Sequence, residues 1–443
     1  MPQHIVIIGN GIAGITCARN IRKKGNDTIT VISSETEHFY SRTALMYIFM
    51  GHMKYEHTKP YEDWFWEKNR IQLLKDHVTS IDIKDKKLSL QNSDAISFDK
   101  LVIATGSVSN KPNFPGMELR GVQSLYGIPD IELMNENSKG IKNAVIIGGG
   151  LIGIEMAEML LSRDVKITFL VRENLYWDNV LPKEEAQIIS NHIREHHVDL
   201  RNAAEIKEIK GDSNGKVISI ITTNGEEISC EFVGVTVGVS PNISLLKNSE
   251  IETDRGVLVN DFFETNLPDV YAIGDCVQHR NPPAGRKPVE QVWYTGRIHG
   301  ETLAATLCGN KSAYNPAPWF NSAKFFDIEY QTYGTINPQE QEHETSFYWE
   351  HDKGKICFRA VYNKVDETII GFNVLGMRLR HEICDKWLQE KRKIDDVMIH
   401  LNQLNFDPEF FDNHEIGILS LFNQQTKKNI SRKKKKRLSF FAW

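Results

Sequence analysis

Three glycines near the start of the chain, Gly9, Gly11 and Gly14, have a spacing that suits the binding of a diphosphate. They follow the apolar run HIVII and precede IAGITCARNIRKK, which we expect to form a helix. The first glycine permits a tight turn, the second lets backbone approach a pyrophosphate, and the third lets the helix pack against the strand. The helix N-terminus would face the phosphate charge. The spacing therefore predicts a dinucleotide site.

Glu35 supports this prediction, because it ends the next expected strand, TITVISSE, about twenty residues after Gly14. A carboxylate at this distance is suited to holding the hydroxyl pair of a ribose. A glycine turn of this kind is weak evidence alone. Here strand, helix and acid occur together, which favours a dinucleotide site over a plain glycine turn.

The same glycine spacing recurs as Gly148, Gly150 and Gly153, after the run NAVII and before LIGIEMAEMLL. Another expected strand, VKITFLV, leads to Arg172 and Glu173. Two complete motifs predict two bound dinucleotides, or one fold retained only as a scaffold.

Two further strand ends have residues suited to a ligand. Thr105 and Gly106 follow KLVIA, and Gly274 and Asp275 follow DVYAI. Doubly wound sheets bind ligands at the carboxyl ends of their strands. We therefore expect these residues beside a cofactor.

The stretch HFYSRTALMYIFM, residues 38–50, contains no thiol. The six cysteines form neither a CxxC pair nor a disulfide framework, which suits a reducing, cytoplasmic location; they are Cys17, Cys230, Cys276, Cys308, Cys357 and Cys384. The histidines, including His196 and His197, show no metal-ligand spacing. We expect no metal site.

Together the four motifs resemble the two-dinucleotide flavoproteins of the pyridine nucleotide–disulfide oxidoreductase superfamily, over about residues 4–335. The resemblance implies FAD on the first fold and a nicotinamide nucleotide on the second. It implies that FAD is held by Gly9, Gly11, Gly14, Glu35, Thr105, Gly106, Gly274 and Asp275. The nicotinamide nucleotide would be held by Gly148, Gly150 and Gly153, with Glu155 near its nicotinamide end.

Within this superfamily the chain resembles the ferredoxin and rubredoxin reductases, which include apoptosis-inducing factor. The turn FYSRTAL, with Arg42 expected near the cofactor, is similar to their Y-x-R-P-x-L turn, and PAPWFNSAKFF is similar to the start of their C-terminal domain. Leu45 stands where disulfide reductases have a cysteine. Two departures concern the flavin surroundings, because Tyr47 replaces a lysine and residues 321–324 replace a Trp-Ser-Asp-Gln segment.

The expected fold is α/β, with two Rossmann-like dinucleotide-binding domains, for FAD and NAD(P), and a smaller α+β C-terminal domain. We expect the FAD domain to be split, and the boundaries are 1–115 and 250–315 for FAD, 116–249 for NAD(P), 316–410 for the C-terminal domain and 411–443 for a flexible basic tail. Runs with the pattern of a helix alternate with runs with the pattern of a strand in the first two domains, as βαβ units require.

The tail contains the basic block from Arg432 to Arg437, followed by Phe440, Phe441 and Trp443. Such a block stays solvated, and it could lack a role, dock an acidic protein or rest on an anionic membrane surface. The net charge of −5 argues against a chain whose whole surface binds nucleic acid.

The leading hypothesis is an FAD-dependent NAD(P)H oxidoreductase that passes electrons through flavin to a small iron–sulfur or similar redox protein. A membrane-surface NADH:quinone oxidoreductase and a flavoprotein that binds partners according to its redox state are the alternatives. Arg172 favours a 2′-phosphate and Glu173 disfavours one, so we expect both NADH and NADPH to serve, with less than about a hundredfold preference.

Overall fold

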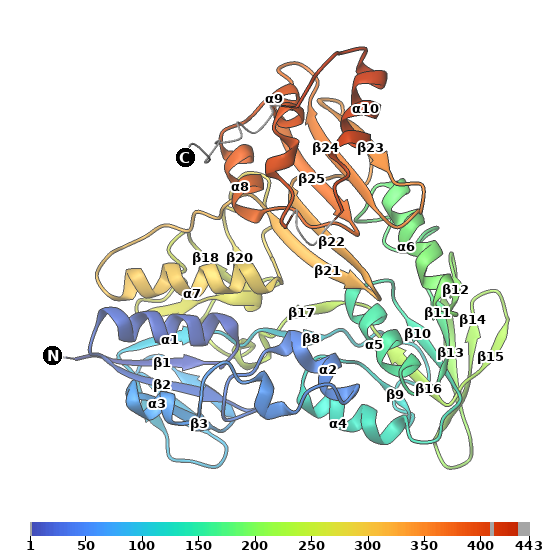
Figure 1. Ribbon diagram of the computed structural model, residues 1–443. Helices are drawn as coiled ribbons and strands as arrows, with labels where there is room; N and C mark the ends of the chain where they lie inside the picture. The colour runs from blue at the N-terminus through green and yellow to red at the C-terminus, as the bar shows by residue number, and fades with distance from the viewer. Residues whose placement is uncertain (1, 408–411, 433–443) are drawn as a thin grey trace, which may run out of the picture. The chain divides into compact units, whose positions relative to one another are not determined.

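The computed structural model describes residues 2–407 and 412–432 and divides into two compact units (Figure 1). The first unit comprises Met1–Arg172 and Val198–Pro316, and the second comprises Glu173–His197 and Ala317–Trp443. Each unit has its own hydrophobic core. Within the described ranges, no helix combines the length and the apolar character needed to cross a bilayer.

The first sheet of the first unit has five parallel strands in the order β19-β7-β1-β2-β3. They are β1 (His4–Ile8), β2 (Thr28–Ser33), β3 (Ile71–Lys75), β7 (Lys100–Ile103) and β19 (Val270–Ala272). Helices α1 (Ile12–Lys24) and α7 (Trp293–Leu307) lie side by side against it (Figure 1). β1 has β2 on one side and β7 on the other, so the strand order reverses there. The carboxyl ends of β1 and β7 therefore flank a ligand crevice.

The second sheet of this unit is also parallel throughout, in the order β12-β11-β10-β16-β9. Its strands are β9 (Val122–Gln123), β10 (Asn143–Ile147), β11 (Lys166–Leu170), β12 (Asp199–Arg201) and β16 (Phe232–Val235). Helix α5 (Leu151–Leu161) follows β10, and α4 (Ile128–Asn137) follows β9. The apolar runs of β10 and β16 are buried, as expected for strands of a parallel sheet covered on both faces.

Shorter elements complete the first unit. Two antiparallel sheets are formed by β4 (Val78–Asp82), β5 (Lys87–Leu90) and β6 (Ile96–Ser97), and by β13 (Ile206–Gly211), β14 (Val217–Thr222) and β15 (Glu227–Ser229). Two strand pairs join β8 (Ser107–Ser109) to β17 (Val239–Pro241), and β18 (Val257–Val259) to β20 (Val277–His279). Helices α2 (Leu45–Phe49) and α3 (Trp64–Lys68) lie between β2 and β3 in the chain.

The second unit is built on an antiparallel sheet in the order β21-β22-β25-β24-β23. The strands are β21 (Phe320–Phe325), β22 (Ile328–Gly334), β23 (Glu344–Glu350), β24 (Cys357–Asn363) and β25 (Ile369–Leu375). The helices are α6 (Lys183–Glu195), α8 (His381–Gln389), α9 (Ile394–Ile399) and α10 (Glu415–Thr426). Successive side chains of a strand point to opposite faces. Phe358 accordingly joins the core with α8, α9 and α10, whereas Arg359 forms an ion pair with Glu185 of α6.

These observations confirm the predicted fold class, an α/β protein with two parallel Rossmann-like sheets and a smaller α+β part. The predicted domain boundaries remain a prediction. The predicted flexible tail, 411–443, must be narrowed, because α10 lies within it and buries Ile418 and Phe422. The basic block from position 433 onward, with Phe440, Phe441 and Trp443, lies outside the described residues.

Candidate functional site

The first glycine turn joins β1 to α1, and its three glycines meet different demands. Gly9 has a φ of +119°, and a Cβ there would lie 2.0 Å from the carbonyl oxygen of Ala104. A Cβ on Gly14 would lie 2.1 Å from the carbonyl oxygen of Gly9. Gly11 has an ordinary extended backbone, and a Cβ there would meet no atom within 4 Å. Two glycines are therefore required by the fold, whereas Gly11 borders open space.

Helix α1 begins next to this open space. No side chain caps its N-terminus, and its first turn contains no acidic residue. Its last turn carries Arg22, Lys23 and Lys24, whose charges suit a helix C-terminus. The first turn thus offers backbone N–H groups and positive dipole to a ligand without a competing carboxylate, and this donor set fits the pyrophosphate of a dinucleotide.

Glu35 lies two residues beyond the end of β2 and is the centre of a polar cluster. Its carboxylate accepts hydrogen bonds from Arg42 Nη2 at 2.5 Å, from the Tyr40 hydroxyl at 2.5 Å and from the Ile128 backbone N–H at 3.0 Å. Burial raises the pKa of this carboxyl, but the hydrogen bond and charge of Arg42 outweigh burial, so the pKa lies below its usual range. The carboxylate is therefore ionised, and the structure brings together Glu35 and Arg42, two of the predicted residues.

The segment that precedes α4 completes this cluster, and no pattern in the sequence predicts its role. Arg42 Nη1 donates to the carbonyl oxygen of Tyr126 at 2.7 Å, and the guanidinium lies 4.6 Å from the centre of the Tyr126 ring. A Cβ on Gly127 would lie 2.4 Å from Glu35 Oε1. These residues are about ninety positions from Glu35, and no spacing rule links them.

A second polar group lies at the ends of β7 and β19. Ser107 Oγ donates to Asp275 Oδ2 at 3.1 Å, and Gln291 Nε2 donates to Ser107 Oγ at 2.7 Å. Burial raises the pKa of Asp275 to about 6, although Ser107 and the charge of Arg42 oppose the shift. The structure thus orients the predicted Asp275 through Ser107 and Gln291, by hydrogen bonds that the sequence did not predict.

The other predicted residues at these strand ends are held by the backbone. Thr105 Oγ1 donates to the carbonyl oxygen of Asn242 at 2.6 Å. Gly106 and Gly274 both have positive φ angles, +68° and +79°. A Cβ on Gly274 would lie 2.8 Å from Cβ of Ala13, so α1 packs closely against this turn.

The second glycine turn joins β10 to α5 and repeats the geometry of the first. A Cβ on Gly148, which has a φ of +107°, would lie 2.5 Å from the carbonyl oxygen of Thr236. A Cβ on Gly153 would lie 2.7 Å from the carbonyl oxygen of Gly148. A Cβ on Gly150 would meet only Thr236, at 3.9 Å. The first turn of α5 has no acidic residue and no side-chain cap, so this donor set also fits a pyrophosphate.

Glu155 lies in the second turn of α5. Burial, together with the charge of Glu158, raises the pKa of Glu155 to about 7. Beyond β11, the Arg172 side chain is exposed, and Glu173 Oε1 accepts a hydrogen bond from Asn179 Nδ2 at 3.4 Å. Arg172 belongs to the first unit and Glu173 to the second, so the nucleotide preference stays a prediction.

All six cysteines are free, and none lies in α2 or next to it in the sequence. Burial raises the pKa of every one of these thiols, to about 11 for Cys276 and about 12 for Cys230. In α2 itself Leu45 and Met46 are buried, and the Tyr47 ring stacks on that of His52. The thiols are therefore protonated at neutral pH, which makes them poor nucleophiles.

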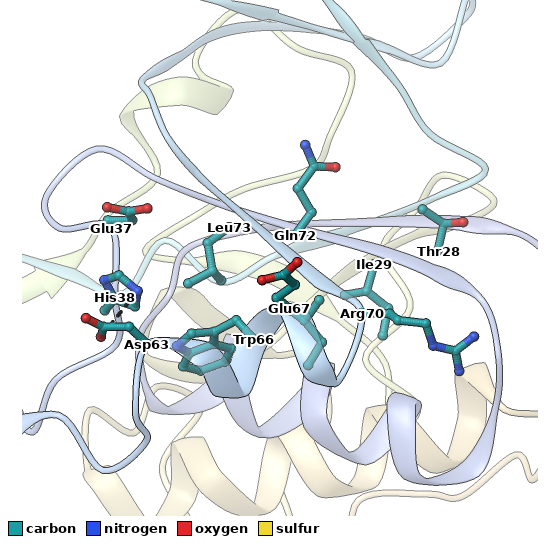
Figure 2. A pocket seen from close by; sticks show the side chains of 11 residues that line it. Thr28, Ile29, Glu37, His38, Asp63, Trp66, Glu67, Arg70, Gln72 and Leu73 are labelled. Carbon is teal, nitrogen blue, oxygen red and sulfur yellow. Dashed lines mark ion pairs between the residues drawn. The ribbon is translucent and has the colours of Figure 1, made fainter.

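A cavity of about 470 Å³ lies away from both glycine turns, between α3 and the strands β2 and β3 (Figure 2). Figure 2 shows His38 and Asp63 facing each other at one end, with a distance of 3.5 Å between His38 Nε2 and Asp63 Oδ1. Trp66 forms part of the wall. None of the predicted site residues lines this cavity, so the dinucleotide predictions concern a different part of the unit.

Comparisons with known proteins agree with this geometry. The model of the family described as pyridine nucleotide-disulphide oxidoreductase matches residues 3–297. A nitrite reductase [NAD(P)H] of Bacillus subtilis (strain 168) is 28% identical over 84% of this chain, and the chain spans 45% of that protein. An NADH-rubredoxin oxidoreductase of Clostridium acetobutylicum is 27% identical, over 86% of this chain and 94% of that protein. The structure of a ferredoxin reductase from Rhodopseudomonas palustris has a TM-score of 0.78 and 22% identity, and covers 84% of this chain and 91% of that one.

Proposed function

Because the chain belongs to the pyridine nucleotide-disulphide oxidoreductase family, we propose that it is an FAD-dependent NAD(P)H oxidoreductase that passes electrons to a small redox protein. The observation that carries this proposal is the pair of glycine turns. Each turn lies at the carboxyl end of a parallel sheet. A Cβ on its second glycine would meet no atom within 4 Å at Gly11, and only the carbonyl oxygen of Thr236, at 3.9 Å, at Gly150. Relatives named as rubredoxin and ferredoxin reductases confirm the resemblance to that branch.

The residues of the first sheet fit FAD. We propose that Gly9, Gly11 and Gly14 with the start of α1 bind its pyrophosphate, that Glu35 binds a ribose, and that Thr105, Gly106, Gly274 and Asp275 contact the flavin half. When bound, FAD accepts the electron pair of a nicotinamide and can release electrons one at a time. Arg42 holds Glu35 ionised, and the chain from Gln291 through Ser107 orients the Asp275 carboxyl.

The residues of the second sheet fit a nicotinamide nucleotide, NADH or NADPH. We propose that Gly148, Gly150 and Gly153 with the start of α5 bind its pyrophosphate, and that Glu155 lies near the nicotinamide end. Backbone N–H groups and the positive helix end would neutralise the phosphates without a charged side chain. We also propose the predicted division into domains: an FAD domain formed by 1–115 and 250–315, an NAD(P) domain formed by 116–249, and a C-terminal domain formed by 316–410.

The unreactive state of the cysteine thiols favours the transfer of electrons to an acceptor outside this chain. A disulfide reductase needs a reactive thiol beside its cofactor, whereas α2 has none and every cysteine has a raised pKa. We therefore propose that electrons leave directly to a partner, which the name of the Clostridium acetobutylicum relative suggests is a rubredoxin-like, iron–sulfur type of protein. Six free cysteines support a cytoplasmic location. A membrane surface as an additional partner rests on the basic block alone.

The proposal is tested by supplying acceptors one at a time. The FAD-loaded protein is mixed with NADH or NADPH and, in separate assays, with rubredoxin, ferredoxin, a short-chain quinone or a disulfide. We expect flavin reduction by either nucleotide and fast turnover with at least one of the iron–sulfur proteins. Faster turnover with the quinone than with either protein would favour the quinone reductase, and reduction of the disulfide would contradict the proposal.

A further inference from the structure

Two histidines and an aspartate converge at a point in the second unit. His192 belongs to the last turn of α6, His196 is the C-cap residue of this helix, and Asp327 belongs to the turn between β21 and β22. The Nε2 atoms of the two histidines lie 3.2 Å apart. Oδ1 of Asp327 lies 2.6 Å from Nε2 of His192 and 3.0 Å from Nε2 of His196. Three potential metal ligands thus face one another, one from each side chain.

The local structure holds all three side chains in place. Positions i and i+4 lie on the same face of a helix, which aligns the two imidazoles. Asp327 is in a two-residue hairpin turn, closed by the pairing of Phe325 with Ile328. The ring of Phe326, the other turn residue, stacks on that of His196 with centres 4.2 Å apart and an angle of 9° between the planes. The cluster therefore does not depend on a flexible loop.

The surroundings of His192 match the outer shell of a metal-bound histidine. Its Nδ1 faces Oε2 of Glu195 at 3.5 Å, and Glu195 pairs with Lys355 at 2.8 Å. A metal-bound imidazole commonly directs its other N–H to a carboxylate, which fixes the tautomer and leaves the lone pair on the binding nitrogen.

The distances suit a small ion better than hydrogen bonding alone. In a tetrahedral site with bonds of about 2.0–2.1 Å, ligand atoms lie about 3.3 Å apart. The two Nε2 atoms already have nearly this separation, and only the exposed Asp327 side chain would need to retreat, by about 0.3–0.7 Å. Without an ion, both imidazoles compete for one carboxylate oxygen. With an ion, all three atoms have the same partner.

We propose that His192, His196 and Asp327 form a binding site for a divalent transition metal of the zinc type, completed by water. Imidazole nitrogen and carboxylate oxygen are ligands that zinc accepts, and side chains that are 38% and 67% exposed at His196 and Asp327 leave room for water. The ion would link α6 to the β21–β22 hairpin. This site is independent of the proposed oxidoreductase activity, and the sequence alone had predicted none.

The test uses the untagged, FAD-loaded full-length protein after treatment with a chelator. It is titrated with Zn²⁺ by calorimetry and with Co²⁺ by visible absorption, which reports the coordination of cobalt. We expect one ion per chain, and binding at least tenfold weaker in His196→Gln and in Asp327→Asn. The matched control is His197→Asn, which removes an exposed neighbouring imidazole outside the cluster and should bind as the wild type does.

Folding is followed by circular dichroism in every variant, and the two substituted side chains were chosen because they are exposed. Glu195→Gln provides a milder second variant, with binding about tenfold weaker because an outer partner is lost. Zinc should raise the Tm of the wild type and of His197→Asn, but not that of His196→Gln. The proposal is overturned if the wild type shows no saturable binding, or if His196→Gln and Asp327→Asn bind as tightly as the wild type does. Equal weakening in His197→Asn would also overturn it.

Discussion

Gly11 and Gly14 make a matched pair for testing whether the first glycine turn binds a dinucleotide. A valine at position 11 meets no protein atom near its Cβ and has an ordinary extended backbone. The only expected cost to the apoprotein is the replacement of a glycine at a helix N-cap, about 1 kcal/mol or less. A valine at position 14 would drive its Cβ into the carbonyl oxygen of Gly9 and toward Ile7, at 2.1 Å and 3.2 Å.

The two variants should therefore fail for different reasons. Gly11→Val keeps the ligand away from the backbone N–H groups, and each hydrogen bond to a charged group contributes about 1.5–3 kcal/mol. Loss of two such bonds gives about 3–6 kcal/mol, or FAD binding weaker by about 10² to 10⁴. Gly14→Val overpacks the contact between helix and strand, which costs about 1–3 kcal/mol or more from a typical stability of about 5–15 kcal/mol.

The assay compares apoproteins first and FAD binding second. Thermal unfolding followed by circular dichroism should give Gly11→Val a Tm close to that of the wild-type apoprotein, and a clearly lower Tm for Gly14→Val. Titration with FAD, followed by flavin fluorescence, should then show the loss of affinity in Gly11→Val. A folded Gly11→Val protein that retains FAD at wild-type affinity would refute the assignment of this turn.

Four further predictions concern the remaining parts of the chain. Gly150→Val should keep its fold and its FAD, because the new Cβ would meet only Thr236, at 3.9 Å. The valine side chain should keep the nucleotide away from the backbone N–H groups, so binding of NADH and NADPH should be lost, as measured by the rate of flavin reduction at increasing nucleotide concentrations. A variant with all six cysteines replaced by serine or alanine should still reduce its flavin with NAD(P)H, and a folded, FAD-loaded protein that cannot would disprove the thiol-free mechanism. The pKa of Glu155 is raised to about 7, so the folded state binds a proton more tightly than the unfolded state does, and the free energy of unfolding falls as pH rises from about 4.5 to 7. In denaturant titrations, Glu155→Gln should therefore be more stable than the wild type above pH 7, by at most about 3 kcal/mol, and should lose this advantage below about pH 4.5. Removal of residues 433–443 should leave flavin reduction unchanged, and slower transfer to a protein acceptor or lost sedimentation with anionic vesicles would identify the role of the basic block.

The truncation starts at position 433 because the folded second unit extends beyond residue 411, the predicted start of the tail. Lys428 Nζ donates to Asp395 at 2.7 Å and to Glu367 at 3.1 Å, so residues before this point are part of the folded second unit. The run EIGILSLF contains apolar residues at helical spacing, including Ile418 and Phe422. This apolar periodicity predicts a helix, although dense positive charge follows it in the sequence.

Local patterns were readable from the sequence, and distant contacts were not. Gly9 and Gly148 could be predicted because turn, strand and helix are adjacent in the chain. The partners of Glu35 at Tyr126 and Ile128, and the chain from Gln291 to Asp275, depend on how separate βα units pack. Contrary to the interpretation of the sequence, His192 and His196 have the i, i+4 spacing of a ligand pair, but their third partner, Asp327, is more than a hundred residues away.

The central claim is that electrons pass from a nicotinamide through flavin to an external acceptor without a thiol centre. It is tested most directly by anaerobic titration of the FAD-loaded protein with NADH, with the flavin absorbance recorded after each addition. We predict that one equivalent of NADH reduces the flavin completely, and that two equivalents of an oxidised one-electron iron–sulfur protein reoxidise it. A requirement for two equivalents of NADH per flavin would reveal a second two-electron centre, such as a disulfide, and would contradict the account.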